Sequence, residues 1–390
     1  MSITEHIILF TLLFGVYAFW GKFNANKSNV VFWLAALVPI LMYTLITGSR
    51  FGWGNDYFWY WAQFENPEFT NDQMAFKWLN LFIYYIGMNY VGAFMVYAFI
   101  FIVCAFVFTR SFGEYSTYMY CFLIPALLFT STNTIRQGVA TSFIFLALVF
   151  LKNKKWIYLC IVVIIAYYIH SAAILPFVAL IGSFFVLKKP IHYAISIPLF
   201  LFFTFVYNPL YTTYLADFLE KYVNIGGKFQ AYIDNSEAWF GENAINLGYV
   251  PGKFALFFSS LFYIAICYLG YQALQIRYDR RIVYIYNVVV ASNIICYAVN
   301  LFEILSRIVQ SMQMFYFVPV GYILYVYFND CQQIENDRAF KLKKVFFVGI
   351  MLILADIVRY WGRFILLNKK ADFFWHHFYD EINLNNFLFF

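Results

Sequence analysis

Long apolar stretches recur along almost the whole chain, and most of them are separated by short polar segments. A membrane-spanning helix needs about 20 predominantly apolar residues, and lengths of roughly 17–25 are usual. The pattern therefore predicts an all-α polytopic membrane protein with about 12 transmembrane helices, within a range of roughly 10–14. The expected spans are residues 3–20, 30–47, 90–108, 117–131, 135–151, 156–169, 171–187, 191–207, 253–272, 282–302, 308–328 and 343–361. Residues 78–87 are apolar but too short to span, so we expect an interfacial or re-entrant helix there.

The amino-acid composition agrees with this pattern and excludes an ordinary soluble domain. Hydrophobic residues make up 63% of the chain and charged residues only 12%, whereas a soluble domain carries about 25% charged residues. A soluble core of this size could not bury so much apolar surface, so lipid must surround much of the chain. No internal repeat is apparent, and residues 1–390 are predicted to form a single transmembrane domain.

The charged residues are distributed unequally between alternate loops. One alternating set holds 15 of the 26 Lys and Arg residues but only 5 of the 20 Asp and Glu residues. Because cytoplasmic loops are enriched in Lys and Arg, this set is predicted to face the cytoplasm. The opposite face then carries two long loops, residues 48–89 and 208–252, which are expected to form an active-site cleft. It also carries residues 362–390, expected to be an amphipathic tail on the membrane surface.

The first candidate site segment follows the second expected span and runs from Arg50 to Tyr57. Two glycines within it allow the backbone to approach a ligand closely. An arginine can hold a phosphate through paired hydrogen bonds, while a carboxylate such as Asp56 and a flat ring such as Trp53 suit a sugar. A turn with an Arg50–Asp56 pair and interfacial aromatic residues would explain the same segment without a ligand.

The second candidate segment opens the fifth expected span. Asn133 or Thr134 is a suitable N-cap residue, which places Arg136 and Gln137 in the first helical turn. The N-terminus of a helix carries a partial positive charge, so an arginine there is unfavourable unless an anion joins it. The segment therefore favours a diphosphate-binding site over an arginine that only reaches toward lipid headgroups.

Two further candidates lie at span ends. His170 follows the sixth span and could act as a general base or contact a phosphate, although a structural hydrogen bond is the commoner role of a lone histidine. Glu303 and Arg307 are four residues apart between the tenth and eleventh spans. On a helix these two side chains share a face, so they could pair with each other as readily as with a substrate.

In these residues the chain resembles the EpsG-type family of bacterial polysaccharide polymerases, within the wider Wzy-like group of O-antigen and exopolysaccharide polymerases. The resemblance covers roughly residues 45–320 in order and orientation. It is carried by Arg50 with Gly54, Asp56 and Tyr57, by Asn133 with Arg136 and Gln137, by His170–Ser171, and by Ser306–Arg307.

The resemblance implies a membrane-embedded glycosyltransferase of GT-C-like type, inverting, independent of metal and without a cofactor. Its substrate would be an oligosaccharide repeat unit on undecaprenyl diphosphate, and its active site would lie on the extracytoplasmic face of the cytoplasmic (inner) membrane. The implied diphosphate ligands are Arg136, Arg307, Arg50 and Gln137. The implied base is Asp56, with His170 and then Glu303 as alternatives. The implied sugar-binding residues are Tyr57, Trp53 and Asn133.

Other functions remain open at this point. A glycan ligase would use the same lipid-linked donor and much the same site. A flippase or exporter of lipid-linked oligosaccharide should carry polar residues along a path through both leaflets, whereas here they gather on one side. Besides the lipid-linked oligosaccharide and membrane lipid, expected partners are flippase and chain-length regulator proteins. The basic residues are dispersed in short loops, so no nucleic-acid partner is expected.

Overall fold

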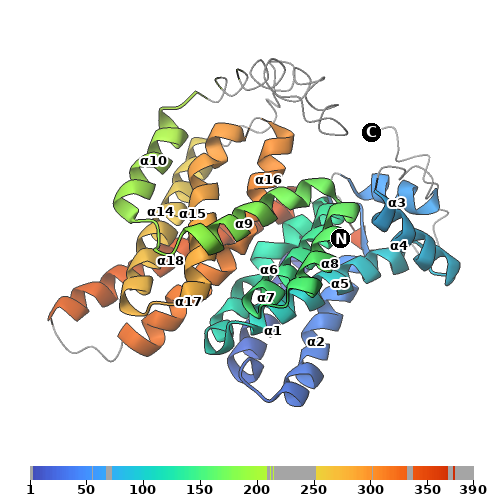
Figure 1. The fold of residues 1–390 in the computed structure, drawn as a ribbon, viewed down its shortest axis with the longest axis horizontal. Coiled ribbons are helices and arrows are strands. Elements are labelled where there is room, and N and C mark those ends of the chain that lie inside the picture. Colours follow the sequence, from blue (N-terminus) through green and yellow to red (C-terminus); the bar gives the residue numbers. More distant parts are fainter. Residues whose placement is uncertain are drawn as a thin grey trace. The chain divides into compact units, whose positions relative to one another are not determined.

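The computed structural model describes residues 3–54, 56–66, 73–208, 211, 214, 252–300, 302–331, 337–367 and 372–373, and these are nearly all helical (Figure 1). The helices of the N-terminal half are α1 (Ile3–Asn24), α2 (Asn29–Gly48), α3 (Tyr57–Glu65), α4 (Met74–Tyr85), α5 (Tyr90–Arg110), α6 (Ser116–Asn133), α7 (Ile135–Lys152), α8 (Trp156–Ile169), α9 (Ile174–Val186) and α10 (Tyr193–Phe205). Those of the C-terminal half are α14 (Lys253–Ile276), α15 (Arg280–Val299), α16 (Glu303–Gln313), α17 (Phe317–Tyr325) and α18 (Asp337–Leu367). Two short strands, β1 (Arg50–Phe51) and β2 (Asp372–Phe373), pair in antiparallel fashion.

Each of the expected spans coincides with a helical segment. In the part of the chain that the structure describes, 8 helices are long and apolar enough to cross a membrane. The segments α8, α9 and α10 are apolar but shorter, at 14, 13 and 13 residues. The chain is thus a helical, multi-pass membrane protein. The count of about 12 spans remains a prediction, because short helices need not cross the bilayer completely.

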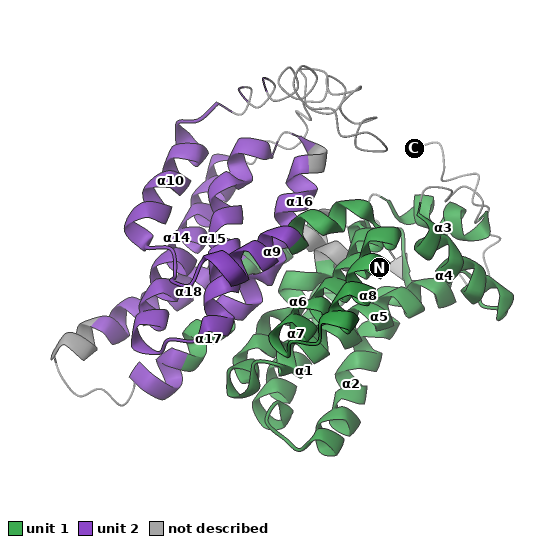
Figure 2. Ribbon diagram, in the orientation of Figure 1, with its two compact units in different colours: residues 1–177, 320–325, 357–390 green, residues 178–319, 326–356 purple. Residues whose placement is uncertain are grey.

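The chain groups into two compact units (Figure 2). Unit 1 comprises residues 1–177, 320–325 and 357–390, and unit 2 comprises residues 178–319 and 326–356. The prediction of a single transmembrane domain is not decided by this grouping. Of the predicted outer loops, residues 48–89 contain β1, α3 and α4, whereas residues 208–252 lie almost entirely outside the described part. At the predicted tail, α18 continues to Leu367 before the described part ends, apart from β2.

Unit 1 is built from helices that are neighbours in pairs: α1 packs on α2 and α6, α2 on α5, and α7 on α5 and α8. Gly48, at the end of α2, permits one of these close approaches. A Cβ atom at this position would lie 2.4 Å from the Met95 side chain of α5. Small residues of this kind let helix backbones approach in membrane proteins. The contact fixes the point where the chain leaves α2 and enters the candidate site.

Within each unit, the basic loops that are predicted to face the cytoplasm contact one another. In unit 1, Lys152 donates to the carbonyl of Ser111, and Arg110 Nη2 donates to the carbonyl of Lys27 at 3.4 Å. In unit 2, the Tyr278 hydroxyl donates to the carbonyl of Lys188 at 2.7 Å. This is the grouping expected of loops on one side of a membrane. Which side is cytoplasmic remains a prediction from loop charge.

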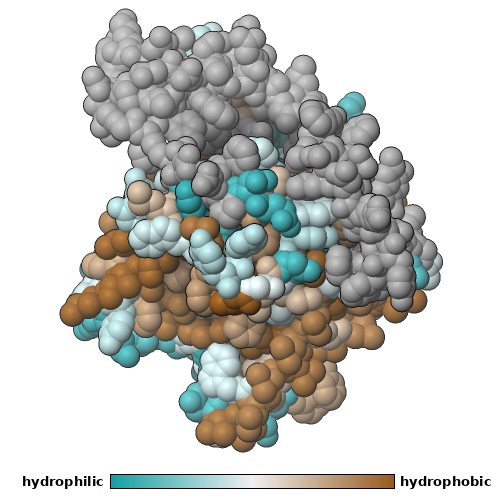
Figure 3. Space-filling model, turned by 90° about the vertical axis from the view of Figure 1, so that its right-hand side faces the viewer, coloured by the Kyte–Doolittle hydropathy of each residue, from teal (hydrophilic) through white to brown (hydrophobic). Residues whose placement is uncertain are grey.

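Helix α4 is short, and its two sides have different surroundings. With 12 residues it is too short to span a bilayer, and one side buries Asn80 against α5. The other side exposes an apolar stripe formed by Met74, Trp78, Phe82 and Tyr85. Broad hydrophobic areas also cover the lower part of the face shown in Figure 3, as expected of a protein surrounded by lipid. A helix is present near residues 78–87, as predicted, but it runs from Met74 to Tyr85, and its interfacial or re-entrant placement stays a prediction.

Candidate functional site

The loop between α2 and α3 lies against the junction of α6 and α7. Gly52 and Gly54 have φ angles of +69° and +88°, which few other residues adopt without strain. A Cβ atom at Gly54 would lie 2.5 Å from the carbonyl oxygen of Thr132, near the end of α6. The structure therefore brings the segment after Arg50 and the segment before Arg136 together in unit 1.

Arg136 lies in the first turn of α7, as the sequence predicts, and its side chain is half-buried. Its guanidinium carbon lies 5.6 Å from the centre of the Tyr60 ring. The buried Nε atom has no hydrogen-bond partner in the described structure. A guanidinium with an unused donor at the positive end of a helix is an arrangement that an anion would stabilise.

Tyr60, on α3, connects Arg136 with Asp56. Burial raises the pKa of the Tyr60 hydroxyl, the charge of Arg136 lowers it, and the charge of Asp56 raises it. Both charged residues therefore act on the same hydroxyl. Asp56 is the N-cap of α3 and is a partly exposed residue. Tyr60 was not predicted from the sequence as a site residue, although it lies one helical turn after Asp56 on α3.

His170 is the C-cap residue of α8, and its Nδ1 atom lies 3.4 Å from Nε2 of Gln73, the residue that precedes α4. This contact joins residues 97 positions apart. Gln73 was missed because nothing in its local sequence marks it. The bond supports the structural reading of His170.

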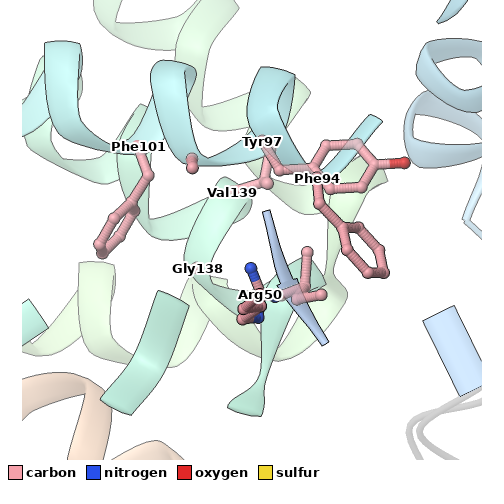
Figure 4. A pocket seen from close by; sticks show the side chains of 8 residues that line it. Arg50, Phe94, Tyr97, Phe101, Gly138 and Val139 are labelled. Carbon is pink, nitrogen blue, oxygen red and sulfur yellow. The ribbon is translucent and has the colours of Figure 1, made fainter. Parts of the chain in front are cut away.

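Arg50 lies deeper than the sequence suggests. Its side chain is 1% exposed, and Nη1 donates to the carbonyl of Thr47. The guanidinium lies 5.0 Å from the centre of the Phe94 ring and lines a cavity of about 10 Å³ (Figure 4). That space is close to the minimum for one water molecule. A diphosphate does not fit in it, so direct contact with Arg50 would need a rearrangement of this region.

Two of the predicted sugar-binding rings are buried as well. Trp53 and Tyr57 are each 0% exposed. Trp53 packs against His6 and Phe10, with ring centres 5.5 and 5.3 Å apart, and Tyr57 packs against Phe94 at 5.1 Å. Neither ring offers an open face to a sugar in this conformation. The physical reason is that aromatic residues in this loop fill the core of unit 1 rather than its surface.

The remaining predicted site residues divide between the two units. Asn133 ends α6, and Gln137 lies buried in the first turn of α7, both in unit 1. Glu303 and Arg307 lie on α16 in unit 2, one helical turn apart as predicted. The side chain of Glu303 is outside the described part of the structure. That these two residues join the site around Arg136 stays a prediction.

The profile of the EpsG family matches residues 33–366, which is most of the chain. The chain belongs to the EpsG family. The match confirms the resemblance and spans every candidate residue from Arg50 to Arg307. No match is found among curated proteins or among solved structures. Membership of the EpsG family supports a polysaccharide-polymerase type of role in general.

The candidate site of this EpsG-family protein offers positive charge that an anionic substrate group could bind. Among the residues described, no group of three or more His, Cys, Asp and Glu side chains is placed to hold a metal. Positive charge comes instead from Arg136 and from the N-terminus of α7. Asp56 and His170 supply the titratable groups of the same unit.

Proposed function

We propose that this EpsG-family protein is an inverting polysaccharide polymerase of GT-C-like type in the cytoplasmic membrane. It would transfer a growing glycan from undecaprenyl diphosphate to the terminal sugar of a new lipid-linked repeat unit, on the extracytoplasmic face. The observation that supports this proposal best is Arg136, a cation with an unused donor at a helix N-terminus. Such a site is suited to the diphosphate of the donor.

The diphosphate is the leaving group of the proposed reaction. A hydroxyl of the acceptor sugar attacks the anomeric carbon, and the bond from that carbon to the diphosphate oxygen breaks. Negative charge develops on this oxygen, where Arg136 and the α7 N-terminus would stabilise it. Gln137 lies in the same turn, and Arg307 is proposed as a second cation contributed by α16. These groups supply the positive charge that the leaving diphosphate needs.

The acceptor hydroxyl must lose its proton to a base. Asp56 is the base we propose first, because the residue is partly exposed and its charge acts on the same Tyr60 hydroxyl as the charge of Arg136. His170 is the second choice. Glu303 is the third. The acceptor proton ends on this base and then passes to water.

The direct test uses purified protein, lipid-linked repeat units and a chelator, with products separated on a gel. We expect a ladder of polymer for the wild type. Arg136→Ala should abolish the ladder while the protein stays folded, and Lys152→Ala, at the opposite end of the same helix, should not. No ladder from the wild type with its cognate substrate would overturn polymerisation. Transfer of glycan to a lipid acceptor without elongation would indicate a ligase instead.

A further inference from the structure

We propose that unit 1 contains a buried site for a small monovalent anion, chloride, between the Arg50 guanidinium and the first turn of α7. No step of the proposed polymerase reaction requires this site. It is a separate binding site that holds the loop before α3 against α7.

The first observation is the state of the Arg50 side chain. It is 1% exposed, and two of its three nitrogens, Nε and Nη2, have no hydrogen-bond partner among the residues that the structure describes. Burial lowers the pKa of Arg50 to about 10, so the guanidinium remains cationic at neutral pH. No carboxylate of the residues described here forms an ion pair with it. A buried charge with unused donors is costly unless an opposite charge accompanies it.

The second observation is the helix beside it. Ile135, Gly138 and Val139 from the start of α7 line the same cavity as Arg50. The first bond within this 18-residue helix runs from the Gly138 amide to the Thr134 carbonyl at 2.8 Å. The backbone amides before Gly138 therefore mark the positive end of the helix dipole. Two independent sources of positive charge converge on one cavity, and both favour an anion.

The size and lining of the cavity limit it to a small anion. Its volume of about 10 Å³ is close to the minimum for one water molecule, so it excludes phosphate and would admit a single chloride ion only if the lining side chains move slightly. Phe94, Phe101 and Val139 make most of the lining apolar (Figure 4). The Tyr97 hydroxyl, another lining group, already donates to Oδ1 of Asn80. A water molecule would satisfy donors but leave the charge unneutralised, whereas chloride does both.

Arg110 provides a matched control within the same unit. Its guanidinium lies over the Phe32 ring at 3.8 Å, and in the described part of the chain its buried Nη1 also lacks a hydrogen-bond partner. However, Arg110 lies in the last turn of α5, where the helix dipole is negative and disfavours an anion. The two arginines therefore differ in the feature that the proposal uses.

The test is thermal unfolding of the purified full-length protein in detergent, without substrate, at constant ionic strength. Replacing gluconate by chloride should raise Tm by about 2–4 °C and then saturate, as expected of a ligand that binds only the folded state. The larger bromide ion should replace chloride less effectively, and sulfate should not replace it. Arg50→Gln should lose the response, while Arg110→Gln should keep it.

A second variant tests the proposal even if Arg50→Gln fails to fold. Val139→Ile adds one methyl group to the cavity and leaves Arg50 in place, so it should remain folded and lose the chloride response. A wild-type Tm that is equal in chloride and gluconate would overturn the proposal and indicate water. A response that survives in Val139→Ile would overturn the location. Since no substrate is present, either failure is independent of whether the protein polymerises glycans.

Discussion

The two ends of α7 carry the same charge in opposite electrostatic settings. Lys152 lies in the last turn, where the helix dipole is negative, and it donates to the carbonyl of Ser111, the C-cap residue of α5. It thus complements the ends of two helices. Arg136 lies in the first turn, where the dipole is positive, and its buried Nε has no partner in the described structure. One cation stabilises the fold, whereas the other is held at a cost that a bound anion would remove.

The contrast separates structural from functional basic residues in a chain that has many of both. Arg110 follows the pattern of Lys152, at the C-terminal end of α5. Arg50 follows the pattern of Arg136, because it faces the start of α7 with unused donors. The position of a cation relative to a helix end is therefore more informative here than its membership of a motif.

The most direct test of this comparison is to replace Arg136 and Lys152 one at a time. Arg136→Ala should lower the rate of glycan transfer by about 10²–10³-fold, the usual effect of losing one donor to a developing oxyanion. Lys152→Ala should leave the rate unchanged. Initial rates with lipid-linked repeat units measure both. Equal losses of transfer rate in the two variants would mean that it makes no difference to transfer at which end of α7 the cation lies.

A second test disturbs the loop that lies against the start of α7. Gly54→Ala should destabilise the protein by about 1–3 kcal/mol, because alanine is strained at φ +88° and its Cβ would meet the Thr132 carbonyl. Gly52→Ala has a similar φ of +69°, but among the described residues the atom nearest to its Cβ would lie 3.8 Å away, so this variant isolates the backbone strain. Thermal unfolding of both variants gives the comparison. If Gly52→Ala destabilised the protein as much as Gly54→Ala, the contact of residue 54 with α6 would not contribute to stability.

A third test keeps the positive charge at residue 136 and replaces the guanidinium by an ammonium group. Arg136→Lys should lower the transfer rate by about tenfold, which corresponds to losing one hydrogen bond of roughly 1.4 kcal/mol. The loss should appear in kcat rather than in KM, since the bond is strongest when charge develops on the leaving oxygen. A variant with wild-type kcat would show that Arg136 acts only as a diffuse charge.

The smallest effect is expected at the other end of α7. Lys152→Ala should destabilise the protein by about 0.3–1 kcal/mol, the usual value of a cation at a helix C-terminus. Arg136→Ala should instead leave stability unchanged or raise it slightly in the absence of substrate. Unfolding without ligand measures both. A larger loss of stability in Arg136→Ala would place that residue among the structural cations.

Much of this arrangement follows from local sequence. The helices coincide with the apolar stretches, and the first-turn position of Arg136 follows from the polar residues before it. The burial of Arg50 and Trp53 could not be predicted, because it depends on packing against Phe94 and His6, which are distant in the chain. The same holds for the contact of His170 with Gln73. Local patterns predict elements, whereas depth within the fold depends on long-range contacts.

The central claim is that the start of α7 binds the diphosphate of a lipid-linked donor. The most direct measurement is the Kd of the purified protein for undecaprenyl diphosphate, compared among wild type, Arg136→Ala and Lys152→Ala. We predict that Arg136→Ala weakens binding by about 10–100-fold, as expected for the loss of a charged hydrogen bond, and that Lys152→Ala binds as the wild type does. Unchanged affinity in Arg136→Ala, or an equal loss in both variants, would contradict the claim.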